Sequence, residues 1–525
     1  MGTIPHLFLL CLVAGSFIVF TEGTATEYKR VCYFTNWSQH RLGIGRFTMD
    51  KVDATLCTHI IYAFAGFDEK FQVITTQQND LETFNNTMKT IKLKYPDLKF
   101  LLAIGGWNFG VEKFSRMVSC ANNRKEFIKS AIAFLHKYKF DGIDYDWEYP
   151  AHRGSPATDK HLFTLLIQET NAAFTVDAQR KRCSRLLLSA AVAAAKSTVA
   201  AAYEINLIHE HLDFINLMSY DLQKQNGKTS HHSPLYASKS IIQTDTVESS
   251  VQTWLRGGVP PEKLVVGLPL YGRSFTLSTT STGIGAPVSG LGSAGPYTKE
   301  KGILAYYEVC PLLNSGYKRV WLDDQKVPYA YRSIYRSGQW VGYDDIPSYR
   351  QKVCWLKLKG LGGAMMWSLD MDDFTGKACK GEAYPLLKLV KKILTTDTGT
   401  FGQCTLPRLY DTLASKESGA TSTPTASGSS SKQESPTSGE TSREEDSVPT
   451  DADADAIIAA FVGTGRPSGT LAAAGDSFCA GQSDGLYPHA SDSHRFYHCA
   501  NGATSDKACP EGLVYSAEIH VCTWP

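Results

Sequence analysis

An excess of one charge is missing from this sequence. It holds 53 lysine and arginine residues against 52 acidic ones, a net charge of +1, and it has no block of basic residues. Nucleic-acid-binding domains and membrane-surface helices depend on such blocks, so their absence argues against both. We therefore expect an uncharged partner, and neither a nucleic acid nor a membrane.

Long hydrophobic runs are also scarce. The apolar stretch at residues 7–20 is too short for a membrane span, and small and polar residues follow it. This is the plan of a secretory signal peptide, although its leading segment has no lysine or arginine. We predict a signal peptide at residues 1–23, with cleavage after Gly23 or Ala25, and a secreted, extracellular protein.

Cysteine usage agrees with secretion. Of 13 cysteines, Cys11 lies in the predicted signal peptide, which leaves twelve. An even number of cysteines suits an oxidising compartment, where they form disulfides.

Aromatic residues almost vanish between Tyr410 and Phe478, where serine, threonine, glycine, proline and glutamate dominate. Such a segment cannot bury enough apolar surface to fold. We predict a globular domain at residues 24–400, a disordered linker at 401–475 and a small module at 476–525. The module has no Cys-x-x-Cys pair, which argues for disulfides over zinc; its four cysteines are Cys479, Cys499, Cys509 and Cys522.

The most informative stretch lies within the globular domain. Residues 141–148 read Asp-Gly-Ile-Asp-Tyr-Asp-Trp-Glu, four carboxylates among bulky apolar residues. If residues 142–147 form a strand, Asp144, Asp146 and Glu148 share one face at spacings of roughly 6 to 7 Å. Burial and like charge raise the pKa of some member of such a group, which favours one protonated acid beside one anion.

That combination suits cleavage of a glycosidic bond, in which an acid protonates the leaving oxygen and negative charge stabilises an oxocarbenium-like centre. Glu148 is the natural acid. Two other interpretations are an edge strand with a solvated acidic face and a Ca²⁺ or Mg²⁺ site. The glycine and glutamate positions that an EF-hand loop requires do not fall in place, and we predict no metal ion.

Eight apolar runs alternate with amphipathic stretches between residues 27 and 398, and each reads as a buried parallel strand. They lie at residues 31–35, 59–64, 100–104, 142–147, 186–192, 214–220, 264–271 and 363–368. Eight such units predict an α/β fold, a (β/α)₈ TIM barrel with its active site at the C-terminal strand ends. Residues 274–346 are too long for one crossover helix. They carry strand-like pieces at 305–309 and 327–331, and we predict an inserted α+β subdomain.

Polar and aromatic residues gather at the predicted strand ends, which packing alone does not explain. They are Asn36, Trp37, Gly105, Gly106, Trp107, Asn108, Asp146, Glu148, Tyr220, Asp221, Tyr271, Arg273 and Trp367.

These motifs resemble those of animal chitinases of glycoside hydrolase family 18. The acidic run at 141–148 matches the family signature in full. Matches also occur at residues 32–37, 62–66, 104–109, 218–221, 271–275 and 366–370. The tail from Asp484 to Trp524 resembles the peritrophin-type chitin-binding module of family 14 and predicts a small disulfide-rich β module.

The resemblance implies substrate-assisted retention, in which the acetamido oxygen of the sugar attacks its own anomeric carbon. Glu148 would be the acid and then the base, Asp146 would stabilise the oxazolinium ion, and Asp144 would tune Asp146. Tyr220 would bind the acetamido oxygen, and Asp141 would be structural. No cofactor is implied, and the chain would act as a monomer.

The implied substrates are chitin and chitooligosaccharides, whose flat, uncharged sugar faces bind to aromatic platforms. The implied substrate-binding residues are Tyr33, Trp37, Phe64, Gly105, Trp107, Asn108, Met218, Asp221, Tyr271, Arg273 and Trp367, with Trp524 as the platform of the small module. The resemblance also implies the disulfides Cys32–Cys57 and Cys310–Cys379. It leaves Cys120, Cys183, Cys354 and Cys404 unassigned.

The sequence departs from the family pattern in three places. On the acceptor side of the site, Gln223 to Asn226 replace a usual His-Gly-Ser-Trp. Residues 192–195 read Val-Ala-Ala-Ala instead of Val-Pro-Ala-Gly. The small module lacks two cysteines, at the positions of Ile519 and Val521. A lectin that has lost catalysis is therefore the alternative to a secreted endochitinase. Lectins of the family typically replace the last acid or the one before it, and both are present here. A structural glycoprotein with a glycosylated stalk is a third interpretation.

Overall fold

The computed structural model describes residues 27–223, 227–239, 244–334, 337–396 and 404, and in the C-terminal part residues 478–480, 482, 485–500, 503–509, 514–517 and 521–523. The predicted signal peptide, nearly all of the predicted linker, residues 224–226, Ile519 and Trp524 lie outside the described residues.

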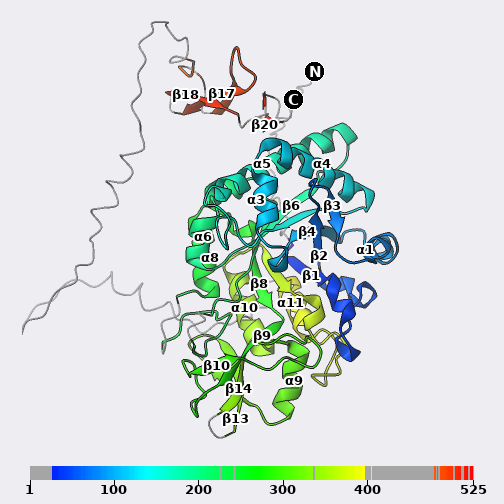
Figure 1. The fold of residues 1–525 in the computed structure, drawn as a ribbon, viewed down its shortest axis with the longest axis vertical. Helices are drawn as coiled ribbons and strands as arrows, with labels where there is room; N and C mark the ends of the chain where they lie inside the picture. The colour runs from blue at the N-terminus through cyan, green and yellow to red at the C-terminus, as the bar shows by residue number, and fades with distance from the viewer. Residues whose placement is uncertain are drawn as a thin grey trace, which may run out of the picture. The chain divides into compact units, whose positions relative to one another are not determined.

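Eight parallel strands close into a barrel, as the apolar runs predicted (Figure 1). They are β1 (Lys29–Thr35), β2 (His59–Phe67), β4 (Lys99–Gly105), β5 (Gly142–Asp146), β6 (Leu187–Val192), β7 (Phe214–Leu217), β8 (Leu264–Pro269) and β15 (Gly363–Trp367). Their order around the barrel is β1-β15-β8-β7-β6-β5-β4-β2, and pairing of β1 with β2 closes it. A short strand, β3 (Val73–Thr75), pairs antiparallel with β2.

Helices cover the outside of the barrel, because the outward-facing side chains of its strands are apolar and must be buried. They are α1 (Asp80–Thr83), α2 (Lys89–Lys94), α3 (Glu112–Val118), α4 (Ala121–Lys137), α5 (Asp159–Lys181), α6 (Lys196–Ala202), α7 (Ile205–Ile208), α8 (Val247–Arg256), α10 (Ile346–Leu358) and α11 (Pro385–Thr395). No helix among the described residues is long and apolar enough to cross a membrane.

Two apolar layers follow from the strand alternation. The outer layer lies between strands and helices, where Trp147 packs on Phe114 of α3 with ring centroids 5.0 Å apart. The inner layer fills the barrel and includes Val31, Tyr33, Ile61, Leu101 and Met365. The barrel is therefore a packed core, and the polar residues concentrate at its rim.

The predicted insertion is a separate antiparallel sheet. Its strands are β9 (Tyr271–Leu277), β10 (Val288–Leu291), β11 (Ile303–Ala305), β12 (Lys318–Leu322), β13 (Val327–Ile334) and β14 (Ser337–Gly342). Residues 305–309 were predicted as strand-like, and this was wrong, because Tyr306–Asn314 form helix α9. The Glu308 carboxylate accepts hydrogen bonds from the backbone N–H groups of Ala305, Tyr297 and Thr298, and so caps the helix start.

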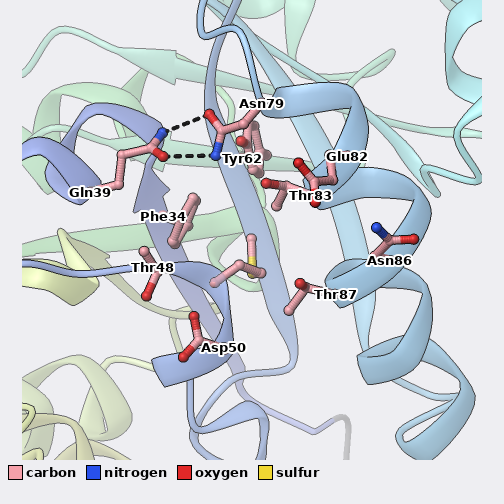
Figure 2. Close-up of a pocket in the computed structure, with 11 residues that line it drawn as sticks. Phe34, Gln39, Thr48, Asp50, Tyr62, Asn79, Glu82, Thr83, Asn86 and Thr87 are labelled. Atoms are coloured by element: carbon pink, nitrogen blue, oxygen red, sulfur yellow. Dashed lines mark hydrogen bonds between the residues drawn. The ribbon is translucent and has the colours of Figure 1, made fainter.

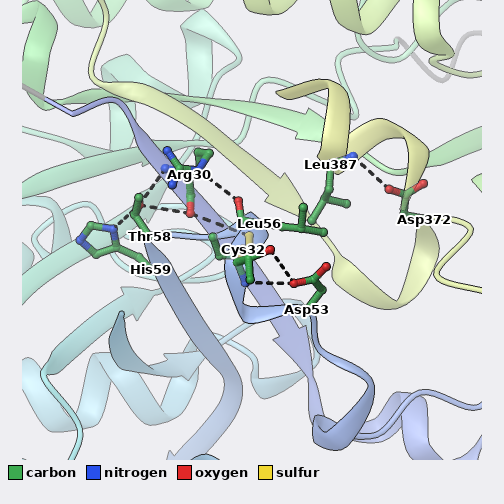
Figure 3. The surroundings of a disulfide bond; sticks show 10 residues. Arg30, Cys32, Asp53, Leu56, Thr58, His59, Asp372 and Leu387 are labelled. Carbon is green, nitrogen blue, oxygen red and sulfur yellow. Dashed lines mark hydrogen bonds between the residues drawn. A yellow bond between two sulfur atoms is a disulfide. The ribbon is translucent and has the colours of Figure 1, made fainter. Parts of the chain in front are cut away.

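Three disulfides tie the barrel domain. Cys32–Cys57 joins β1 to the segment before β2 (Figure 3), and Cys310–Cys379 joins α9 to the chain before α11. These are the two pairs that the resemblance implied. Cys354 of α10, left unassigned from the sequence, is bonded to Cys404. Cys120 and Cys183 are free and exposed.

The C-terminal part contains a three-stranded sheet of β16 (Gly485–Pro488), β17 (Arg495–Ala500) and β18 (Ala503–Ala508), and a pair of β19 (Val514–Ser516) and β20 (Val521–Thr523). Cys479 is bonded to Cys499 of β17, and Phe478 stacks on Tyr497 at 4.4 Å. A disulfide and an aromatic pair thus support a sheet that is too small for a large core.

Candidate active site

Asp144 and Asp146 of β5, with Glu148 just beyond it, form an acidic ladder, and Asp144 points into the barrel. Asp144 is fully buried: its Oδ2 accepts a hydrogen bond from the Tyr33 hydroxyl at 2.7 Å, and its Oδ1 accepts from Ser189 at 2.6 Å and from the Asn216 amide at 3.1 Å. The intervening Tyr145 points the other way, and its hydroxyl lies 2.8 Å from that of Thr170 on α5. Strand alternation thus separates acids from apolar side chains, although β5 ends at Asp146 and Glu148 lies beyond it.

All three carboxyl groups of the ladder have raised pKa values. Burial raises the pKa of Asp144 to about 6, even though its three hydrogen bonds oppose the rise. Burial, and then the charges of Glu148 and Asp144, raise the pKa of Asp146 well above its usual value. Burial also raises the pKa of Glu148 to about 7, with the nearby charge of Arg153 acting in the opposite direction. Asp144 and Glu148 therefore change protonation state between about pH 6 and 7, and Asp146 between them ionises less readily than an ordinary carboxyl group.

One ladder atom lacks a hydrogen-bond partner. Asp146 Oδ1 is buried and accepts no hydrogen bond from any described residue. A buried carboxylate oxygen in this state needs a donor, either a proton shared with a neighbouring carboxyl group or an N–H or O–H of a ligand.

Asp141 stands apart from the ladder. Its Oδ2 accepts a hydrogen bond from the backbone N–H of Phe100 at 2.7 Å and pairs with Lys92. It precedes the start of β5, so it fastens the opposite end of the strand.

The ladder depends on two adjacent glycines at the end of β4. Gly106 N–H donates to the carbonyl of Asp146 at 2.8 Å. A Cβ on Gly105, which has φ +118°, would lie 2.2 Å from the same carbonyl oxygen, and a Cβ on Gly106 would lie 2.5 Å from the Phe64 ring. Only residues without side chains allow β4, β5 and Phe64 to approach this closely.

Aromatic rings from β1, the turn that follows it and β2 gather around Trp367 at the end of β15. Its indole lies 5.2 Å from the Tyr33 ring, 5.8 Å from Phe64 and 6.4 Å from Trp37. Trp37 stacks on Phe64 at 5.8 Å. Trp107 is 55% exposed, and the Arg153 guanidinium covers one face of its ring at 3.5 Å. Asn108 is exposed beside it, and Met218 is buried in the inner layer.

Asp221 is the centre of a second polar cluster, just after β7. It accepts hydrogen bonds from the Tyr271 hydroxyl at 2.8 Å and from Arg273 Nε at 2.7 Å, and a second nitrogen of Arg273 pairs with its other oxygen. The Tyr220 ring lies 6.1 Å from that of Tyr271. The charge of Asp221 also raises the pKa of Glu148, so the two clusters communicate electrostatically.

Several members of these clusters were not found from the sequence. Ser189, Asn216 and Arg153 contact the ladder or its neighbours, and His232 lies beside Asp221. No local pattern marks them, because their roles arise from contacts between distant segments.

A raised pKa alone does not identify the site. Burial raises the pKa of Asp372 to about 7 as well, but Asp372 accepts hydrogen bonds from the backbone of Leu387 and Asp373 and serves the fold. Among the described residues, no group of three or more histidine, cysteine or acidic side chains could hold a metal ion.

Two cavities, of about 210 and 500 Å³, lie on the flank of the barrel beside α1 and α2. Figure 2 shows the first, where Gln39 and Asn79 exchange hydrogen bonds through their side-chain amides. Neither cavity is lined by Asp144, Asp146 or Glu148.

This protein combines a (β/α)₈ barrel, a buried acidic strand and aromatic rings at the rim. These features together are typical of barrel glycosidases. Comparison with family models gives the family: the model for glycosyl hydrolases family 18 matches residues 29–372, and the chain belongs to that family. A second model, for the chitin binding Peritrophin-A domain, matches residues 479–525.

Individual relatives agree with this assignment. The chain is 42% identical over 501 residues to chitotriosidase-1 of Mus musculus, covering 94% of this chain and 95% of the relative. It is similar to the crystal structure of an immunomodulatory active chitinase, TsES1, from Trichuris suis (TM-score 0.67, 42% identity, 70% of this chain and 100% of the other). It is equally similar to human YKL-39, described as a pseudo-chitinase with retained chitooligosaccharide binding properties (TM-score 0.67, 44% identity, 70% and 100%). The family thus contains both active and inactive relatives.

Proposed function

We propose that this protein is a secreted endochitinase that hydrolyses the β-1,4 linkages of chitin and chitooligosaccharides by substrate-assisted, retaining catalysis. The observation that carries the proposal is the pair Asp146 and Glu148, two buried carboxyl groups with raised pKa values at the end of β5.

Each acid has a separate role in this mechanism. Glu148, with a pKa of about 7, is protonated below neutral pH and protonates the leaving oxygen, and it then accepts a proton from water. Asp146 has a buried oxygen without a partner among the described residues, and this oxygen accepts the acetamido N–H as the sugar closes to an oxazolinium ion. Asp144, fixed by three hydrogen bonds, supplies the field that tunes Asp146.

The sugar-binding surface is the aromatic group around Trp367. Trp367 forms the floor beneath the reacting sugar, and Trp37, Phe64 and Trp107 provide platforms for its neighbours. Tyr220 holds the acetamido oxygen, and the Asp221 cluster binds sugar hydroxyl groups. The remaining contacts come from Tyr33, Gly105, Asn108, Met218, Tyr271 and Arg273.

The C-terminal module, at residues 476–525, binds insoluble chitin and is joined to the catalytic domain, residues 24–400, by a linker at 401–475. The protein acts outside the cell as a monomer without a cofactor. Support comes from the match to the chitin-binding family and from the disulfides of both parts.

A chitin-binding lectin is the second candidate, because human YKL-39 is described as a pseudo-chitinase that still binds chitooligosaccharides. The two candidates differ in turnover and not in binding.

The test compares the mature protein with Glu148→Gln on a fluorogenic chitobioside and on colloidal chitin across a pH series. Loss of the acid should lower kcat by at least about 10³-fold while chitin binding persists. The matched control is Glu112→Gln, an exposed glutamate on α3, which should keep parental turnover. Binding without turnover by the parent at every pH would refute the hydrolase and leave the lectin.

A further inference from the structure

Two adjacent histidines are buried next to the Asp221 cluster. His231 and His232 lie in the segment 227–239, between β7 and α8, and both are fully buried. The carbonyl of His232 accepts a hydrogen bond from Leu222 N–H at 2.8 Å, and the Ser233 hydroxyl donates to the Ser219 carbonyl at 2.8 Å. The segment is therefore fastened to the chain that carries Tyr220 and Asp221.

His231 has a fixed protonation state. Its Nδ1 accepts the N–H of Ser233 at 3.0 Å, so its proton resides on Nε2, which lies 2.9 Å from the carbonyl of Tyr343. Burial lowers the pKa of His231 well below its usual value. This ring is a neutral structural group.

His232 has no comparable partners. Its Nδ1 lies 3.4 Å from Asp221 Oδ1, and among the described residues neither ring nitrogen makes a closer hydrogen bond. The ring packs on Tyr271 at 5.0 Å and on His231 at 5.4 Å. The Asp221 side chain is 37% exposed, whereas His232 is buried. His232 therefore lies on the buried side of a carboxylate that a ligand can reach.

The charges of Asp221, Arg273 and Asp344 act on His232. Asp221 is paired with Arg273 of β9, and Asp344, which follows β14, is paired with Lys352 of α10 at 2.6 Å. Tyr271 and His231 are the uncharged titratable neighbours. Burial opposes a charge on His232, but a proton added to Nδ1 has the Asp221 carboxylate oxygen 3.4 Å away.

Resting on the proposed function, we propose that His232 is a positioning residue that takes up a proton in mild acid and then holds the Asp221 carboxylate in place for the bound sugar. Burial lowers the pKa of His232, and the Asp221 carboxylate opposes this. Burial raises the pKa of Asp221, but hydrogen bonds and charge from Arg273 and His232 outweigh burial and leave that pKa below its usual value. Asp221 therefore stays ionised while His232 titrates, and the charged contact exists only on the acid side.

The test measures chitotetraose binding by calorimetry in the full-length chain that carries Glu148→Gln, with His232 intact, His232→Asn or His232→Phe. Asparagine keeps a donor near the Nδ1 position but does not titrate, and phenylalanine keeps the ring without a donor. We expect His232→Asn to bind like the parent near about pH 7.5 and about fivefold more weakly near about pH 4.5. His232→Phe should bind more weakly at both pH values. His161→Asn, which changes a histidine of α5 that is 60% exposed, should leave the pH dependence unchanged.

The outcomes separate this inference from the proposed function. A His232→Asn to parent affinity ratio that stays constant with pH refutes the role of the proton, and parental binding by both variants refutes the positioning role. Turnover by the protein with Glu148 intact is measured separately, so its absence would refute the endochitinase while the binding ratio still tests His232. Should His232→Phe fail to fold in a thermal melt, His232→Asn carries the test alone.

Discussion

Single carboxyl groups set the expected pH dependence. Glu148 acts as an acid only while protonated, and its pKa of about 7 keeps it so in mild acid. As pH rises through this value the acid is lost, so kcat/KM should fall about tenfold for each pH unit above it. The charge of Glu148 raises the pKa of Asp146, and because repulsion between two neighbouring anions is mutual, the charge of Asp146 acts on Glu148 in the same direction.

Asp146→Asn therefore has two separable effects. Removing the like charge lowers the pKa of Glu148, so the basic limb of the kcat/KM profile should move to lower pH. Loss of the charge that stabilises the oxazolinium ion should also lower kcat by about 10²-fold, with a smaller change in KM. A pH series with a soluble chitooligosaccharide measures both. If the basic limb does not move, the charge of Asp146 does not affect the pKa of Glu148.

Among the structural elements, the β4–β5 pair determines whether the site forms at all. Gly105 and Gly110 both have positive φ, +118° and +78°, yet a Cβ on Gly105 would meet the Asp146 carbonyl at 2.2 Å and one on Gly110 would meet nothing within 4 Å. Gly110, with φ +78° and ψ −179°, lies in a backbone region that is almost restricted to glycine, so Gly110→Ala should cost about 1–3 kcal/mol in the free energy of unfolding from backbone strain alone. Gly105→Ala adds a clash with backbone to its own strain and should cost about 4 kcal/mol or more. Urea unfolding of the two variants gives the comparison, and equal losses would contradict the steric argument.

The elements also show what the sequence could and could not predict. The eight barrel strands were predicted correctly, because a parallel strand covered on both sides must be apolar along its length. Some strand ends were wrong: β5 stops at Asp146 and β7 at Leu217, short of the predicted Trp147 and Tyr220. Helix α9 was missed because Glu308 caps it with contacts to Tyr297 and Thr298, about ten residues earlier. His232 and Arg153 were missed for the same reason, since only the folded chain brings them to the site.

At the scale of the whole molecule, the proposed function assigns hydrolysis to the barrel domain and attachment to chitin to the C-terminal module. The barrel domain contains the ladder, and the family match places a chitin-binding domain at residues 479–525. A soluble oligosaccharide needs only the barrel, whereas an insoluble polymer also offers a surface on which a second module can hold the enzyme at high effective concentration. Kinetics on soluble and insoluble substrates should therefore respond differently to changes in the module.

Trp524→Ala in the full-length protein tests this separation. The predicted platform supplies an aromatic face for a sugar ring, and its loss should weaken binding to insoluble chitin by about tenfold, or about 1.4 kcal/mol. Turnover of a soluble chitobioside should stay at the parental rate, because the ladder is unchanged. A chitin pull-down measures the first quantity and fluorogenic turnover the second. Trp367→Ala is the reciprocal variant and should impair soluble turnover while pull-down persists. If Trp524→Ala instead lowers soluble turnover as much as pull-down, attachment and catalysis are not separate functions of the two parts.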